Sequence, residues 1–226
     1  MQRRTLDIIF SAGGMALAGL LLIIGLVMTS NANFAKSYVH DQLAQQKITF
    51  TKASALKPEE KKAACIVKYA GQQLTTGKQA ECFANEYVGL HLKTIPNASG
   101  KTYAELGDVQ TDLRTQIADA TKNNPAAVAG LQKQLADITT ARETVFKGET
   151  LRGLLLTSFG FSVLGSKGGQ VALVCYLVAG LLFLLSIAGF IHAFRTPKTV
   201  GFGVPERKGR KRPLHYETEA EVLPVG

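Results

Sequence analysis

Two uncharged, apolar stretches decide the fold of this 226-residue chain: IIFSAGGMALAGLLLIIGLVM (residues 8–28) and VALVCYLVAGLLFLLSIAGFIHAF (residues 171–194). Each reaches the roughly 20 apolar residues with which a helix crosses a bilayer, so each predicts a transmembrane helix. The mean hydropathy of the whole chain is only +0.09 and 19% of its residues are charged, so the apolar residues are concentrated in blocks. This distribution excludes a freely soluble enzyme, a collagen-like chain and a wholly disordered chain.

The first stretch is rich in glycine, which lets membrane helices approach closely. Its candidate helix-contact positions are Gly13, Gly14, Gly19 and Gly25. A second interpretation stays open, in which this stretch is a signal peptide cleaved after the small residues Ser30-Asn31-Ala32. The apolar core of a secretory signal is about 7–15 residues long, so the greater length here favours a retained anchor.

The charged residues that flank the two stretches predict the topology. Arg3 and Arg4 precede the first stretch, and Arg195 and Lys198 follow the second. Positive flanking residues stay on the cytoplasmic side, so both termini (residues 1–7 and 195–226) are expected in the cytoplasm. The connecting segment, residues 29–170, is then extracytoplasmic.

The extracytoplasmic segment is expected to be helical, which makes the fold class all-α. Residues 33–46 would continue the first membrane helix outward, and residues 47–57, with the β-leaning ITFT, would link it to the next element. Lys57-Pro58-Glu59-Glu60 suits a helix start, because proline fits the first turn and carboxylates fit the positive end of the helix dipole. This helix should run to about Gln72, and another from about Lys78 to Lys93.

Residues 103–145 predict a helical hairpin, because apolar residues recur every three or four positions on both sides of Asn123-Asn124-Pro125. The next piece, LRGLLLTSFGFSVLG (residues 151–165), is apolar but too short to cross a bilayer. Lys167-Gly168-Gly169 separates it from the second stretch. It is expected either as a helix on the outer membrane surface or as a buried helix of the external domain, and the sequence leaves both open.

The cysteines predict one disulfide. Cys65 and Cys82 fall on consecutive expected helices. Cys65 lies seven residues before the expected helix end at Gln72 and Cys82 five residues after the turn LTTG, so an antiparallel arrangement brings them to similar heights. An extracytoplasmic location is oxidising, which favours a structural bond between them. Free thiols and a redox-active pair are less favoured, the latter because the CxxC spacing is absent. Cys175 lies within the second stretch and is expected to act as a small apolar residue.

No catalytic, cofactor-binding or metal-binding residue is assigned. Of the four histidines, His40, His91, His192 and His215, only His40 and His91 share a compartment in the expected topology. A metal site needs several converging ligands, and neither histidine lies in a recognisable ligand motif. The chain also lacks a GxSxG nucleophile elbow and a CxxCH haem-attachment motif.

The C-terminal tail, residues 196–226, combines a basic cluster with the acidic positions Glu217, Glu219 and Glu221, and it is expected to be disordered. The cluster consists of Arg207, Lys208, Arg210, Lys211 and Arg212. Each of these residues can add about 1 kcal/mol of attraction to an anionic inner leaflet, so the bilayer is the expected partner. Nucleic-acid binding is not expected, because no aromatic stacking set accompanies the cluster.

A resemblance to a known family rests on five phrases of the chain: DQLAQQKITF (41–50), ALKPEE (55–60), KYAGQQLTTGKQAECFANEYVGLHL (68–92), GKTYAEL (100–106) and FKGETLRGLLLTSFGF (146–161). In them the chain resembles an uncharacterised family of actinobacterial two-span membrane proteins. The resemblance implies the plasma membrane of a Gram-positive bacterium. Members are sometimes labelled aromatic ring-opening dioxygenases, but two histidines on separate helices do not make the two-histidine, one-carboxylate iron site that such chemistry needs.

The function expected from these features is that of a non-catalytic accessory or scaffolding subunit. Its external helical domain would contact other membrane or envelope components, through residues 151–165 or the hairpin 103–145. Two alternatives stay open. One is an extracytoplasmic sensor that works through a separate signalling partner, and the other is an envelope enzyme that uses the Cys65/Cys82 pair.

Overall fold

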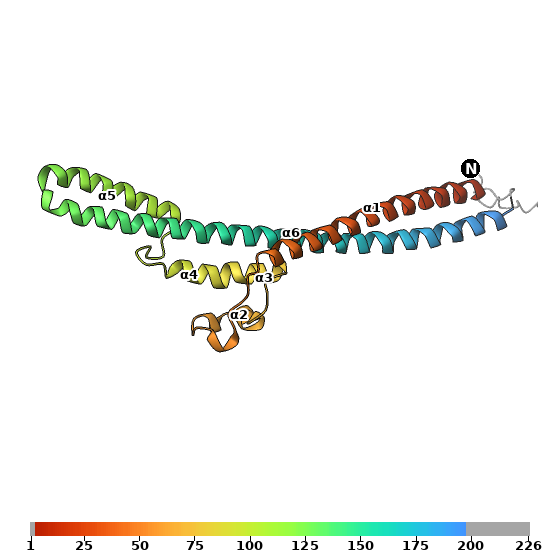
Figure 1. The fold of residues 1–226 in the computed structure, drawn as a ribbon. Coiled ribbons are helices and arrows are strands. Elements are labelled where there is room, and N and C mark those ends of the chain that lie inside the picture. The colour runs from red at the N-terminus through yellow and green to blue at the C-terminus, as the bar shows by residue number, and fades with distance from the viewer. Residues whose placement is uncertain (1–2, 198–226) are drawn as a thin grey trace, which may run out of the picture. The chain divides into compact units, whose positions relative to one another are not determined.

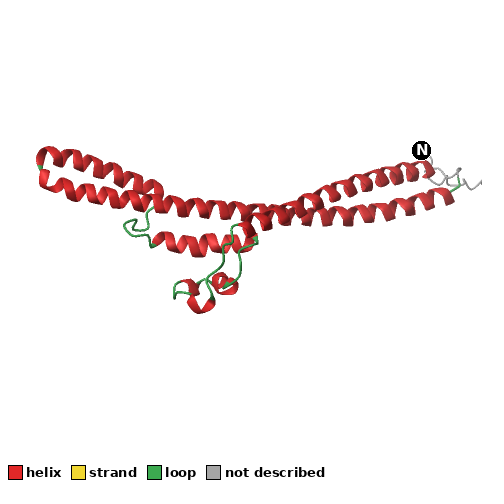
Figure 2. Cartoon of the chain, viewed as in Figure 1, coloured by secondary structure: helices red, strands yellow, loops and turns green. Residues whose placement is uncertain are grey.

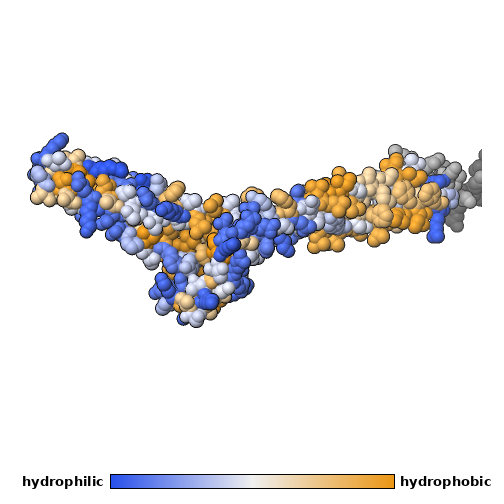
Figure 3. Space-filling view, viewed as in Figure 1, coloured by the Kyte–Doolittle hydropathy of each residue, from blue (hydrophilic) through white to orange (hydrophobic). Residues whose placement is uncertain are grey.

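A computed structural model describes residues 3–197, and the ordered elements of this part are helices (Figures 1 and 2). The longest are α1 (Arg3–Gln45) and α6 (Val128–Arg195), and both are long and apolar enough to span a membrane. Figure 3 shows apolar residues exposed along the paired α1 and α6. The expectation of an all-helical chain with two long apolar helices is therefore confirmed.

Helix α1 continues past the first apolar stretch to Gln45, as the sequence predicts. Helix α6 differs from the prediction, because it runs for 68 residues without interruption. The expected break at Lys167-Gly168-Gly169 is absent, and residues 151–165 are the middle of α6 and not a separate helix. The two glycines do not end the helix because they face α1, where a Cβ on either would lie 3.8–3.9 Å from the Cβ of Ala32. Close helix contact offsets the cost of about 1 kcal/mol for a glycine inside a helix.

The chain divides into two compact units, each containing part of α1 and part of α6. In the unit that contains residues 18–180, the ring of Tyr176 packs over Gly25, and its hydroxyl lies 2.9 Å from Thr29 Oγ1. Further along the same pair of helices, a Cβ at Gly165 would lie 2.9 Å from Ala35 Cβ. The helices pack closely here because small residues face each other.

The unit formed by residues 3–17 and 181–197 is built in the same way. Here Ser11 packs against Gly189, and Gly14 packs against Ser186, whose Oγ would lie 2.5 Å from a Cβ at residue 14. Both serines are buried, at 5% and 4% exposure. Of the four glycines proposed as contact points, Gly14 and Gly25 thus lie in the interface, whereas a Cβ at Gly13 or Gly19 would meet nothing within 4 Å.

A lobe follows α1, built from short elements: η1 (Ala53–Ala55), η2 (Glu60–Lys62), α2 (Ala64–Tyr69), α3 (Gly77–Cys82), η3 (Phe83–Val88) and α4 (Gly89–Lys93). The last three form one helix with a π-helical turn in the middle, which confirms the helix predicted from Lys78 to Lys93. The helix predicted from Lys57 to Gln72 was wrong in extent. Ala63 is extended (φ −87°, ψ 105°) and separates η2 from α2. The Glu60 side chain accepts from the Lys57 amide, so the predicted helix start is present although the helix is interrupted.

The linker that contains ITFT pairs with the segment after α2. The Phe50 amide donates to Gln72 O at 2.9 Å, and the Leu74 amide donates to Ile48 O at 2.8 Å. This pairing carries Phe50 and Leu74 into the core, where both are almost fully buried beside Ile66. The same cluster includes Val39 and Leu43 of α1 and Leu155 of α6, so the lobe shares one core with the two long helices.

A second, smaller core joins α5 (Tyr103–Asn123) to the start of α6, with η4 (Pro125–Ala127) as the turn between them. Leu106 and Val145 are its largest buried side chains. Thr102 caps α5, and its backbone and hydroxyl hydrogen bonds to the Glu105 carboxylate lower the pKa of Glu105. Helix α5 and the start of α6 form the predicted antiparallel hairpin. The second arm does not end at residue 145, because α6 continues to Arg195.

The small-residue contacts predict opposite effects for two matched substitutions. Gly25→Ala places a Cβ 2.7 Å from Cε1 of Tyr176, a ring that the Thr29 hydrogen bond holds in place, so we expect a loss of about 1–3 kcal/mol. Gly19→Ala enters open space on the same helix and should leave stability unchanged or slightly raised. Thermal unfolding of the full chain in a mild detergent measures both, and equal effects would contradict the packing described here.

Candidate functional site

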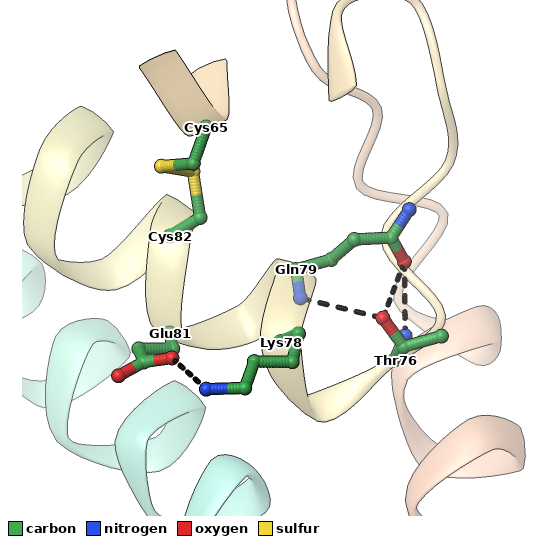
Figure 4. The surroundings of a disulfide bond; sticks show 6 residues. All are labelled: Cys65, Thr76, Lys78, Gln79, Glu81 and Cys82. Carbon is green, nitrogen blue, oxygen red and sulfur yellow. Dashed lines mark hydrogen bonds and ion pairs between the residues drawn. A yellow bond between two sulfur atoms is a disulfide. The ribbon is translucent and has the colours of Figure 1, made fainter. Parts of the chain in front are cut away.

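The lobe is closed by the predicted disulfide, which joins Cys65 of α2 to Cys82 at the end of α3 (Figure 4). The two Cα atoms lie 6.0 Å apart, and 17 positions separate the residues in sequence. The turn between them is fixed by Gln79, whose side-chain oxygen accepts from the amides of Thr75 (2.9 Å) and Thr76 (3.0 Å). In return, the Thr76 hydroxyl accepts from the backbone amide of Gln79. These reciprocal hydrogen bonds form a capping box, which sets where α3 begins.

Aromatic rings line up inside the lobe. Phe50 stands edge-on to Phe83 at 5.2 Å between ring centroids, and Phe83 stacks on Tyr87 at 4.6 Å. Tyr87 in turn contacts the imidazole of His91 at 4.4 Å. Offset and edge-on contacts of this kind are each worth about 0.5–1.5 kcal/mol beyond burial, so the column stabilises the lobe.

The lobe also buries one carboxylate. Glu60 is 2% exposed, and its Oε2 accepts from the Lys57 amide at 2.8 Å. Its Oε1 lies 3.5 Å from His91 Nε2. His91 Nδ1 lies 2.8 Å from the carbonyl of Tyr87, which can only accept, so Nδ1 carries a proton. Sequence analysis missed Glu60, because the helix-start pattern at Lys57-Pro58-Glu59-Glu60 places both glutamates at a solvated helix end.

The histidines of the described part occur in separate pairs with one carboxylate each. His40 contacts Asp41 at 3.1 Å, and His192 contacts Asp7 at 3.0 Å across α1 and α6. Within residues 3–197 no three His, Cys, Asp or Glu side chains gather as a metal site would require. His215 and the basic cluster of residues 207–212 lie outside the described residues.

Helix α6 exposes large apolar side chains in the segment that precedes the second apolar stretch. Leu154 is 63% exposed, Phe161 50% and Leu164 69%, although all three lie outside residues 171–194. Between this face of α6 and α1 runs a groove of about 310 Å³, which we call the α1–α6 groove. Its lining includes Tyr38 and Leu43 of α1 and Leu151, Leu154 and Phe161 of α6. Most of its lining area is apolar, and Gln42, Gln46 and Ser158 add polar groups.

The disulfide predicts a measurable share of the lobe's stability. Replacing both cysteines by serine frees a loop of 17 residues, which the chain-entropy model values at about 3 kcal/mol. Hydrogen exchange should then accelerate in α2 and α3, while the α5–α6 hairpin keeps its protection. Cys175→Ser is the matched control and should change neither region. Unchanged exchange in α2 and α3 of the double variant would show that the disulfide does not stabilise the lobe.

Comparison with known proteins returned no match: no family model, no curated protein and no solved structure matches this chain. The function is therefore argued from the chain's own geometry, in particular from the two apolar helices, the disulfide-closed lobe and the exposed apolar groove.

Proposed function

We propose that the protein is a non-catalytic accessory or scaffolding subunit of the bacterial plasma membrane, held by two transmembrane helices. The α1–α6 groove is the observation that carries this proposal. Apolar side chains as exposed as Leu154 and Phe161 are unfavourable in water, and a contiguous exposed apolar surface typically marks an interaction site. The proposal places this surface outside the bilayer core, where a protein partner can cover it.

The topology proposed is the one that the flanking charges predict, with both termini cytoplasmic and residues 29–170 extracytoplasmic. The disulfide supports it, since such bonds persist mainly in oxidising compartments. The lengths of the helices fit a connecting segment that projects from the bilayer, because α1 extends 17 residues beyond Met28 and α6 begins 43 residues before Val171. An actinobacterial host, implied by the family resemblance, fits this arrangement and remains part of the proposal.

The occupant proposed for the groove is the apolar face of a helix from a membrane-protein partner. The apolar positions of α6 in the groove extend over eleven residues, or about 15 Å of helix: Leu151, Leu154, Leu155 and Phe161. That length accommodates about three turns of a docked helix, which presents anchors at similar spacing. Polar side chains at the rim, including Gln42, Gln46 and Ser158, can hydrogen-bond and so set the register of such a helix.

Cysteine accessibility tests the topology. In a Cys175→Ser background, Lys133→Cys places a thiol on the exposed face of α6 near the hairpin turn. A membrane-impermeant maleimide should label it in intact cells. Thr196→Cys, at the opposite end of α6, should be labelled only after permeabilisation. Labelling of both sites in intact cells, or of neither, would overturn the proposed topology.

A charge in the groove tests the partner proposal. The full chain, purified from its native host in mild detergent, should migrate as a complex of reproducible stoichiometry that is larger than the chain alone. Leu154→Glu should remove the partner, because a carboxylate would be desolvated in the interface. Thr144→Glu adds the same charge to an exposed position of the same helix and should leave the complex intact. A wild-type chain that migrates alone, or two variants that behave alike, would contradict the proposal.

A further inference from the structure

A second cavity, of about 350 Å³, is lined by residues of α1 and α6 and by the start of α3, and it combines apolar walls with several polar side chains. Glycines open it, because Gly77, Gly165 and Gly169 contribute backbone without side chains to its walls. Gly77 packs directly on Ser162, so this close approach of α3 to α6 requires a residue without a Cβ. The cavity is thus a built feature of the fold and not a gap between loose elements.

The lining of the cavity is suited to an anion. Lys36, His40, Asn33, Ser162 and Ser166 are among the residues that line it, together with the apolar Ala32 and Val39, and no Asp or Glu is among them. Lys36 is exposed and makes no ion pair within the described part of the chain. The nearest acid in sequence, Asp41, is already engaged with His40 Nδ1 at 3.1 Å. Lysine and hydroxyl donors together are a common set for phosphate.

The height of the cavity points to the source of that phosphate. Asn33 lies five residues beyond Met28, and Ser166 lies five residues before Val171. At 1.5 Å per residue both are therefore about 7.5 Å outside the ends of the two apolar stretches. The headgroup layer on each side of a bilayer is roughly 5–8 Å thick, so both helices independently place the cavity at headgroup level. Lys36, one turn further out, is long enough to reach down to it.

We propose that this cavity binds the phosphate headgroup of an anionic phospholipid from the outer leaflet. Lys36 supplies the charge, and Asn33 and Ser166 donate hydrogen bonds to the phosphate oxygens. The inference rests on the proposed insertion of α1 and α6 into the membrane, and it adds a lipid ligand that the partner-binding groove does not require.

Lipid titration followed by native mass spectrometry tests the inference on the full chain in mild detergent. Phosphatidylglycerol should bind more tightly than phosphatidylcholine with the same acyl chains. Lys36→Gln should weaken phosphatidylglycerol binding about fivefold, which corresponds to about 1 kcal/mol for one lysine near the surface. Lys36→Arg should retain binding, and Lys133→Gln, which removes the same charge from an exposed site on the hairpin, should have no effect.

Three results would overturn the inference: equal affinity for the two lipids, equal effects of Lys36→Gln and Lys133→Gln, or displacement of the lipid by inorganic phosphate at matched concentration. The last would mean that the site takes free phosphate. Flotation with vesicles separates this inference from the proposed function. A chain that floats with both lipids but shows no preference contradicts only the lipid site, whereas a chain that floats with neither contradicts membrane insertion itself.

Discussion

Close packing of small residues between α1 and α6 is the constraint on which the rest of the structure depends. The proposed membrane insertion of α1 and α6 would require such packing. Helices in a bilayer gain little from hydrophobic burial against each other, because lipid tails are as apolar as leucine, so they associate through tight contact and buried hydrogen bonds. The pair uses both means, with glycines at the points of closest approach and the Thr29–Tyr176 hydrogen bond between the helices. Large apolar residues are thereby turned outward, which is why so many are exposed on both helices.

The lobe depends on the same pair of helices for its core. Its own elements are short, and a six-residue helix such as α2 is not stable in isolation. The disulfide and the Thr76 capping box fix them locally, while Val39, Leu43 and Leu155 complete the apolar cluster. The imidazole of His91 contacts both the buried Glu60 carboxylate and the ring of Tyr87, which is the last ring of the aromatic column. His91 therefore links the polar and the apolar parts of the lobe's interior.

The sequence predicts the elements of this fold better than their continuity. Hydropathy alone identifies the two apolar helices, and helix geometry on either side of LTTG predicts the disulfide. The prediction of a helix break at Gly168-Gly169 was wrong, because paired glycines are typical both of a turn and of a close helix contact. The spacing of small residues could have distinguished them, because Gly14, Gly25, Ala32 and Ala35 of α1, which contact α6, lie 11, 7 and 3 residues apart and so fall on one face of the helix. The burial of Glu60 and the two cavities carry no local signal, since residues far apart in sequence form them.

The position of the disulfide has a consequence for the order of assembly. The ribosome delivers a chain from its N-terminus, so both cysteines emerge before any residue of α6. The loop between them can therefore be oxidised while Leu155, which completes the core beneath the lobe, has not yet been synthesised. Until α6 arrives, the cross-linked lobe presents an uncovered apolar surface to its surroundings. The order of synthesis thus allows the disulfide-closed loop to form first and to pack afterwards on α6, which is made later.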